Sequence, residues 1–320
     1  MGQSIQQHIV PEFLLSHFPV KGNDRLFTFD KWTEKIFATT PEKAAKEGGF
    51  YDIELDGKVT SLESPLSNLE SAVAPIIDGL VGGIQINQRT KEERVTLGLF
   101  CVVQMQRDRN SRAAWIDFRD QMREHLKKLG ADPAKVKGFE DPSDEEMKAS
   151  SVLHIATAVK FLPYLLDKTW SLQVVPPGAN LFSSDSPVTL HNERTFGFYG
   201  NIGLAVPGIE ISLPISSELN LWMTCPSIRR DIRRRYLKAQ FHRWILRRDI
   251  PSLPLIKNLV RSLAGKEVFR LTPANVERLN SLQVARAERF VYSRTEDFSL
   301  VRRMISDNPS FKKGRRIKLN

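Results

Sequence analysis

Three ionisable side chains in this sequence are candidates for catalysis. His8 stands three residues before a proline in the stretch QHIVPEFLLSHF, and Glu70 falls on the apolar side of an expected helix. Asp185 lies between two expected strands in FSSDSPV, and sheet ends often present functional groups. A histidine and two carboxylates can bind a divalent metal ion that activates water. We therefore predict His8, Glu70 and Asp185 as catalytic residues that converge from distant segments.

Each of these residues also has a structural interpretation. His8 could hold the backbone where Pro11 opens the first helix. Glu70 could form a buried ion pair, because a carboxylate on an apolar face is costly without a partner. Asp185 could accept hydrogen bonds from backbone amides in a local turn. A shared cleft would favour catalysis, whereas separated and individually satisfied positions would favour structural roles.

An arginine-rich stretch, QRDRNSR, follows directly on an expected buried helix. The planar fork of arginine suits phosphates and carboxylates. We therefore predict Gln106, Arg107 and Arg112 as substrate-binding residues. The alternative is a solvated helix end in which Arg107 or Arg112 pairs with Asp117 or Glu70.

The net charge of +10 comes largely from one segment. Residues 226–248 carry nine Lys and Arg against a single acid, and apolar residues recur among them near helical spacing. This pattern predicts an exposed basic helix, which attracts polyanions by counterion release. An anionic membrane surface, an acidic protein, or simple pairing with scattered acids would also fit. The predicted nucleic-acid-binding residues are Arg229, Arg230, Arg233, Arg234, Arg235, Arg243, Arg247 and Arg248.

Size and composition limit the class of protein. A chain of 320 residues with 41% hydrophobic and 26% charged residues is long enough for one large domain or two fused parts with a substantial core. Cys101 and Cys225 form no disulfide framework or paired metal spacing, which favours a reducing, cytoplasmic location. We expect no secretion signal and no transmembrane segment. Glycine-rich phosphate loops, the His-Glu-x-x-His helix and the Gly-x-Ser-x-Gly elbow are missing from the sequence.

Hydrophobic periodicity predicts a mainly helical part over 1–168. Two aromatic and aliphatic runs predict a small hairpin over 26–39. Start and stop signals, including a Thr-Pro pair and a capping box, bound the helices. The helices are expected over 41–48, over 64–82 with a kink at Pro75, over 91–105 in the core, and from 143 to 165.

From Trp170 the periodicity changes to that of an antiparallel sheet with short strands. The extended runs are 170–174, 180–183, 187–191, 209–213 and 219–223. Helices return with the basic segment, and Thr272-Pro273 begins a last one. We therefore expect an α+β fold, with an α/β part over 169–310. Residues 311–320 form a second basic cluster without apolar periodicity, which predicts a flexible basic tail.

Four groups of residues together resemble a known family. They are His8-Ile9-Val10-Pro11 with Phe13, Leu14 and Phe18, the pair Glu63 and Glu70, Gln106-Arg107 with Arg112, and the stretch FSSDSPV over 182–188. This combination resembles the family called domain of unknown function 4238, whose recognised signature is the His-x-x-Pro motif. The resemblance covers nearly the whole chain. It implies a set of residues and no mechanism, because the family has no assigned activity.

Two functions fit these observations. The first is a metal-dependent hydrolase of nucleic acid, such as a nuclease or another phosphodiester hydrolase. In it, a divalent metal ion is the cofactor at His8, Glu70 and Asp185, while Arg107 and Arg112 hold phosphate. The second is a non-catalytic binding or effector protein whose basic helix docks nucleic acid, an acidic partner or a membrane surface.

Overall fold

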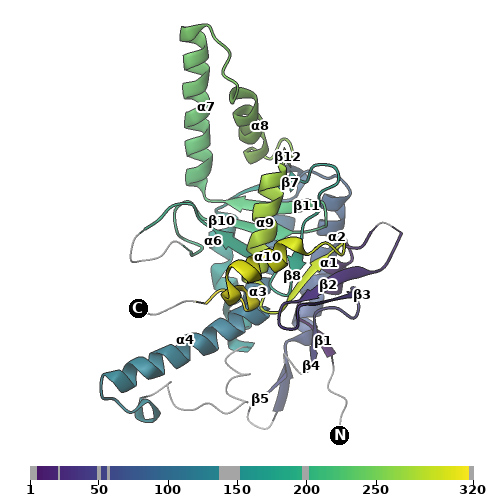
Figure 1. Cartoon of the computed structure of the whole chain (residues 1–320), viewed down its shortest axis with the longest axis vertical. Coiled ribbons are helices and arrows are strands. Elements are labelled where there is room, and N and C mark those ends of the chain that lie inside the picture. Colours follow the sequence, from purple (N-terminus) through teal and green to yellow (C-terminus); the bar gives the residue numbers. More distant parts are fainter. Residues whose placement is uncertain are drawn as a thin grey trace.

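The computed structural model describes residues 6–20, 22–48, 52–55, 58–136, 152–196 and 202–316. These residues form an α+β structure of helices and short, largely antiparallel sheets, as the sequence predicts. The sheets and most helices form a central body (Figure 1). Two helical projections leave this body at different ends, namely α4 (Arg109–Lys128) and the pair α7 (Pro226–Leu246) and α8 (Leu253–Leu263).

The N-terminal segment contributes strands to three sheets. β1 pairs with β4, β5 pairs with β6, and β2 and β3 form the predicted hairpin. This hairpin belongs to a four-stranded sheet of order β3-β2-β13-β8, so strands from the two ends of the chain lie side by side. The bounds are β1 Gln6–His8, β2 Leu26–Asp30, β3 Lys35–Thr39, β4 Lys46–Gly48, β5 Asp52–Leu55, β6 Lys58–Ser61, β8 Ser183–Ser184 and β13 Phe290–Ser293.

The helix predicted over 41–48 is wrong. Residues 41–45 form turns, and β4 occupies 46–48. Ala45 has a φ of 54°, in the left-handed region where an α-helix cannot continue. Backbone pairing with β1, in which His8 lies opposite Lys46, therefore replaces the expected helical turn.

The first long helices agree with their sequence signals. α2 (Glu63–Val81) contains Pro75, and α3 (Lys91–Arg107) begins at the predicted capping box. There the Thr90 hydroxyl accepts a hydrogen bond from the backbone amide of Glu93, and the Glu93 carboxylate accepts one from the backbone amide of Thr90. Short helical turns complete this region. They are α1 Glu12–Leu15, η1 Ile86–Gln88, η2 Pro133–Lys135, η3 Ala158–Phe161 and α6 Leu162–Leu166.

Two helices in this region differ from the sequence predictions. The helix expected from 143 begins outside the described residues. From 152 the chain is helical, and it changes to a 3₁₀ turn at η3 before α6, so the expected single helix is interrupted. α4 has no counterpart among the predicted helices. Most of its residues are polar, and Asn110 is its one buried residue.

A five-stranded sheet of order β12-β7-β11-β10-β9 lies in the second half of the chain. One face of the sheet is apolar and packs with α2 and α3 in the largest core cluster. Members of this core include Val73, Ile77, Leu97, Phe100, Leu172, Leu213, Leu221 and Met223. The bounds are β7 Thr169–Val174, β9 Thr189–His191, β10 Glu210–Pro214, β11 Leu219–Thr224 and β12 Phe269–Arg270.

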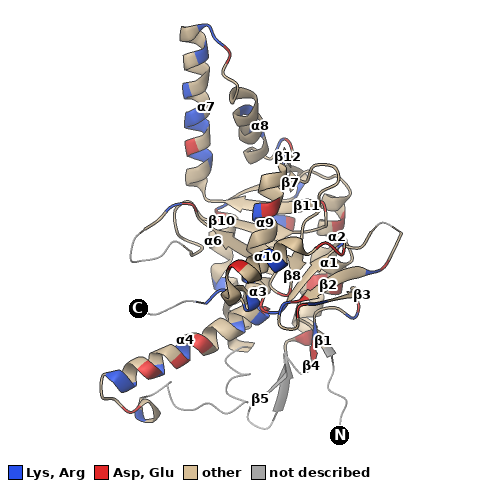
Figure 2. Ribbon diagram, viewed as in Figure 1, with Lys and Arg blue, Asp and Glu red and all other residues tan. Residues whose placement is uncertain are grey.

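Helices return after the sheet, as predicted. α7 contains the basic segment, and none of its residues is buried. Figure 2 shows many Lys and Arg positions in blue along the ribbon of this projecting helix, with little acidic colour among them. α9 (Pro273–Arg286) begins at Thr272, whose hydroxyl accepts the Asn275 amide. α10 (Ser299–Asp307) and η5 (Pro309–Lys312) follow.

The prediction of a flexible tail is wrong for residues 311–316. The Arg315 amide donates to the Ala285 carbonyl oxygen, which fixes the backbone against α9. The Arg316 guanidinium donates to both carboxylate oxygens of Glu288, at 2.7 and 2.8 Å, and lies 2.9 Å from Asp117. Ionic partners on α4 and in the segment between α9 and β13 therefore hold Arg316. Residues 317–320 lie outside the described part.

Among the described helices, none combines the length and the apolar composition that crossing a membrane requires.

Candidate functional site

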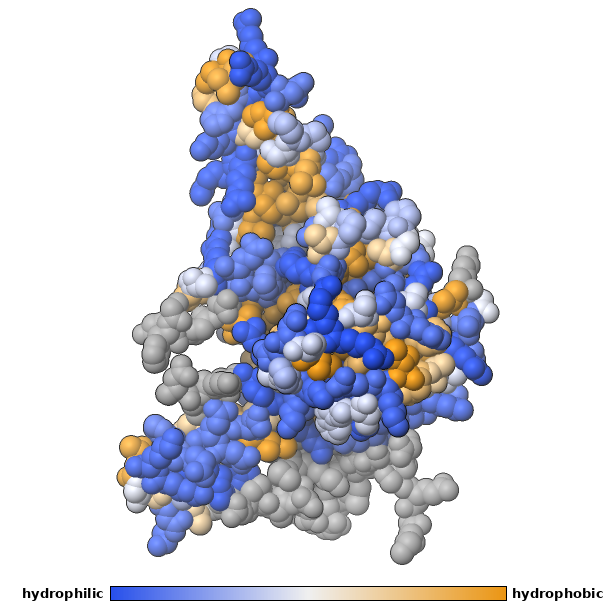
Figure 3. Space-filling model, in the orientation of Figure 1, coloured by the Kyte–Doolittle hydropathy of each residue, from blue (hydrophilic) through white to orange (hydrophobic). Residues whose placement is uncertain are grey.

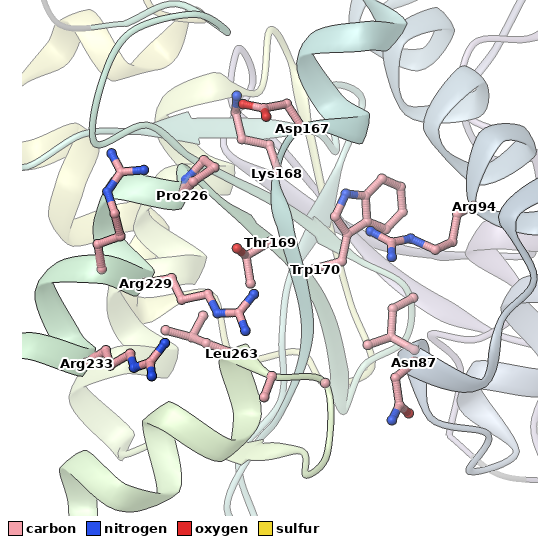
Figure 4. Close-up of a pocket in the computed structure, with 14 residues that line it drawn as sticks. Asn87, Arg94, Asp167, Lys168, Thr169, Trp170, Pro226, Arg229, Arg233 and Leu263 are labelled. Carbon is pink, nitrogen blue, oxygen red and sulfur yellow. The ribbon is translucent and has the colours of Figure 1, made fainter. Parts of the chain in front are cut away.

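A pocket of about 540 Å³ lies at the base of α7 (Figure 4). Five cationic residues line it against one acid, Asp167. The cations are Arg94, Lys168, Arg229, Arg230 and Arg233. We call this cavity the basic pocket. Three of its five cations are arginines that the sequence predicts to bind nucleic acid.

Sheet register explains why α7 begins at this pocket. β11 and β7 are antiparallel, and Thr224 at the end of β11 lies opposite Thr169 at the start of β7. α7 begins with Pro226 directly after β11, so its first turns lie beside the residues that enter β7. Arg229 and Arg233 are one helical turn apart and share a face of α7. The α7 arginines and Lys168 therefore meet at one end of the sheet.

Arg94 and Trp170 form the wall that faces the α7 arginines (Figure 4). The Arg94 guanidinium lies 5.3 Å from the centre of the Trp170 ring, within the range of a cation–π contact. The indole N–H of Trp170 donates to the Leu165 carbonyl oxygen at 2.9 Å. The hydrogen bond to Leu165 orients the Trp170 ring, and the ring in turn positions Arg94 at the edge of the pocket.

The α7 arginines at the pocket are not neutralised by neighbours. Asp231, the acid of the first turns, pairs with Arg194 at 2.6 Å and lies 3.8 Å from Arg234. Within the described part of the chain, no ion pair forms to Arg229, Arg230 or Arg233. These guanidiniums can therefore donate to an anion.

His8 lies in β1 and does not cap α1. Its Nε2–H donates to the Glu42 carbonyl oxygen at 3.0 Å, across the turn that precedes β4. Pro11 occupies the N-cap of α1, where no side chain accepts a helical amide. His8 therefore stabilises the backbone between β1 and β4.

Glu70 and Arg107 meet in an ion pair between α2 and α3. Glu70 Oε1 lies 2.7 Å from Arg107 Nη1, and the Arg107 side chain is buried. Arg107 Nε donates to Gln104 Oε1 at 2.7 Å, and Gln104 Nε2 donates to the Ile9 carbonyl oxygen at 3.0 Å. This chain of contacts links both helices to the His-x-x-Pro segment. The buried ion pair is one of the alternatives that the sequence leaves open.

Asp185 is buried beside the strand β13. Its carboxylate accepts hydrogen bonds from the backbone amides of Glu288, Arg289 and Phe290, at 2.8, 2.8 and 3.0 Å. Burial raises the pKa of this carboxyl group, and the three amide bonds act in the opposite direction. Asp185 thus anchors the backbone that leads from α9 into β13.

The other predicted residues of the arginine-rich stretch lie near the start of α4. Arg112 Nη1 lies 3.3 Å from Glu47, and Arg109 Nε lies 3.2 Å from the same carboxylate, which is on β4. Gln106 is half-buried at the end of α3. The structure therefore joins Glu70 to Arg107, whereas His8 contacts the Glu42 carbonyl oxygen and Asp185 accepts hydrogen bonds from backbone amides.

A second group of side chains could hold a metal ion. His191, Glu193 and Glu210 each offer a ligand atom, and these atoms lie within 4.8 Å of one another. Burial raises the pKa of Glu210, whose carboxylate accepts the Trp222 indole N–H at 2.8 Å. Burial and the nearby Arg278 lower the pKa of His191, which favours the neutral imidazole that ligates metals. Arg278 lies 4.0 Å from Glu210.

A family model described as a protein of unknown function (DUF4238) matches residues 6–297 of the chain. The chain belongs to this family. The match includes every residue of the basic pocket and the three predicted catalytic residues. No curated protein and no solved structure gives a significant match.

Sequence reasoning missed Arg94 and Lys168 of the basic pocket, and all three members of the His191 cluster. The pocket residues come from η1, α3, β7 and the residues just before it, α7, and the end of α8, which no local pattern connects. His191 and Glu193 are two residues apart, but Glu210 joins them through the register of β9 with β10. Strand pairing, which local spacing does not reveal, brings both groups together.

Proposed function

We propose that this DUF4238 member is a non-catalytic binding protein that holds nucleic acid on α7, with a phosphate group in the basic pocket. The observation that carries the proposal is the pocket itself, where five cations face one acid and three arginines have no ion pair among the described residues. The separate partners of His8, Glu70 and Asp185 favour binding over hydrolysis.

The chemistry of the pocket suits a phosphodiester chain. Arginine forks donate paired hydrogen bonds to phosphate oxygens, and each neutralised phosphate releases counterions into solution. Arg229, Arg230 and Arg233 bind one phosphate in the pocket, and Arg234 and Arg235 continue the cationic surface outward along α7. This mode of binding makes the affinity for nucleic acid depend on charge and on salt concentration, with little dependence on base sequence.

A charge-matched pair of variants tests this proposal. The proximal variant carries Arg229→Ala, Arg230→Ala and Arg233→Ala, and the distal variant carries Arg243→Ala, Arg247→Ala and Arg248→Ala. Both lose three positive charges from the same segment. We expect the proximal variant to weaken binding of single-stranded DNA and RNA at least about tenfold more than the distal variant, because it removes the pocket contacts.

Fluorescence anisotropy over a series of salt concentrations measures both affinities. Equal losses in the two variants would mean that charge alone matters and that the pocket does not bind phosphate. The wild-type protein should not cleave the DNA or RNA. Cleavage that is lost in a folded Asp185→Asn variant would show that the protein is a hydrolase and would overturn the proposal of a non-catalytic binding protein.

We also propose that His191, Glu193 and Glu210 bind a divalent transition metal ion. One imidazole and two carboxylates suit Zn²⁺ or Mn²⁺, and the lowered pKa of His191 favours the neutral imidazole, which has one unprotonated nitrogen for a metal. Arg278 competes for Glu210. Isothermal titration should therefore show weaker Zn²⁺ binding in His191→Ala and tighter binding in Arg278→Ala, with the exposed His242→Ala as control. Unchanged affinity in His191→Ala would exclude the site.

A further inference from the structure

The distal half of α7 carries an exposed apolar stripe. Leu237, Phe241, Trp244 and Ile245 are 55%, 56%, 75% and 52% exposed. Their spacing of three and four residues places them on one side of the helix. We call these four residues the apolar stripe. Figure 3 shows apolar surface on the projection that α7 and α8 form.

α8 does not cover this stripe. Ile228, Ile232 and Tyr236 are large half-buried residues of α7 that recur every four residues. At 100° per residue they lie on the side of α7 opposite to the stripe. α8 packs against α7, whereas all four residues of the stripe are exposed. The apolar stripe is therefore left in water in the described structure.

We propose that the apolar stripe inserts into the surface of an anionic lipid bilayer. Arg243, Arg247 and Arg248 lie at the same end of α7, and the nearby acid Asp249 pairs with Arg243 at 3.3 Å. A bilayer with anionic headgroups offers both partners at once, because its headgroups bind the arginines and its acyl chains receive the apolar side chains. Trp244 and Phe241 are aromatic residues of the kind that lie at such interfaces.

Other occupants fit the stripe less well. Nucleic acid would pair with the arginines and stack on Trp244 and Phe241, but it would leave Leu237 and Ile245 in water. A second copy of α7 would bring together two segments that each carry nine cations and one acid, which repel one another. The membrane proposal uses the distal end of α7 and is independent of phosphate binding in the basic pocket.

A triple substitution of the stripe tests the proposal. The stripe variant carries Leu237→Ser, Phe241→Ser and Trp244→Ser, and the control variant carries Leu129→Ser, Leu153→Ser and Val159→Ser. All six side chains are exposed, so both variants should fold. Flotation with vesicles of phosphatidylcholine and phosphatidylserine should show binding by the wild type and the control. The stripe variant should bind about tenfold more weakly or worse.

Tryptophan quenching by lipids that are brominated in their acyl chains supplies a second measurement. We expect quenching of the wild type, and its loss in Trp244→Ser alone. Equal vesicle binding by the stripe variant and the wild type, or wild-type binding without quenching, would overturn insertion. So would a stripe variant that loses nucleic-acid binding or dissociates a dimer, because those results would identify another occupant. The proximal pocket variant should still be quenched, so each proposal can fail alone.

Discussion

The Glu70 carboxylate lies 2.7 Å from the Arg107 guanidinium, and this pair connects α2 to the end of α3. Arg107 also donates to Gln104, which in turn donates to the Ile9 carbonyl oxygen. The segment after His8 is thus held by a polar chain that begins at a residue predicted to be catalytic. Its geometry suggests a structural role for Glu70, which stability measurements can test.

Glu70→Gln should lower the free energy of unfolding by about 2–3 kcal/mol, because Arg107 would keep its charge in a buried position without an anionic partner. Urea denaturation measures this change. Glu124→Gln, which removes an exposed partner of Lys127, should change stability far less. A Glu70→Gln protein of wild-type stability that has lost its binding activity would instead assign Glu70 to a functional site.

Lys31 should make stability depend on pH in the alkaline range. Its ammonium is buried and donates to the carbonyl oxygens of Val284 and Ala287, and burial lowers its pKa from 10.5 to about 8. Between those values the unfolded chain holds a proton that the folded chain has released, so the free energy of unfolding rises with pH. The rise should be about 3 kcal/mol in total.

Urea denaturation at several values between pH 8 and pH 10.5 tests this prediction against Lys31→Met. The difference in stability between the wild type and the variant isolates the lysine from other groups that titrate in this range. A difference that stays constant with pH would show that Lys31 keeps its ordinary pKa in the folded protein.

Much of the fold follows from local signals in the sequence. Thr90, Thr272 and the glycines after α2 mark the ends of helices because they satisfy backbone groups there. Short alternating runs identify the strands of the five-stranded sheet, since one face of the sheet enters the core. These signals depend only on residues that are close together in the chain, so the sequence alone predicts the elements that they mark.

Other features depend on contacts between distant segments. Residues 46–48 become a strand because β1 pairs with them, and residues 311–316 are ordered because Glu288 and Asp117 bind Arg316. The basic pocket likewise requires the register that places Thr224 opposite Thr169. The sequence predicts the arginines of α7, but it cannot predict that Lys168, just before β7, and Arg94 of α3 join them.

His8→Ala should destabilise the protein by about 0.5–1.5 kcal/mol, the net value of one hydrogen bond, through loss of the contact with the Glu42 carbonyl oxygen. Binding of nucleic acid should fall only as far as the folded fraction falls. Chemical denaturation beside a binding assay measures both effects, with the exposed His125→Ala as control. Abolished binding in a variant of wild-type stability would show that His8 acts directly at a site.

Arg233 in the pocket, with Arg234 and Arg235 beyond it, offers a test of the charged surface of α7. All three side chains are exposed, so replacing them by Glu should leave the thermal midpoint within a few degrees of that of the wild type. If each contacts one phosphate of duplex DNA, the slope of log affinity against log salt should become less steep by about 0.9 for each arginine, and by about 2.7 for the three. The matched change Arg233→Lys, Arg234→Lys and Arg235→Lys keeps the charge and should keep the slope, while it weakens binding wherever paired hydrogen bonds to phosphate matter. Affinity and salt slope that remain at wild-type values in the glutamate variant would place the nucleic acid away from α7.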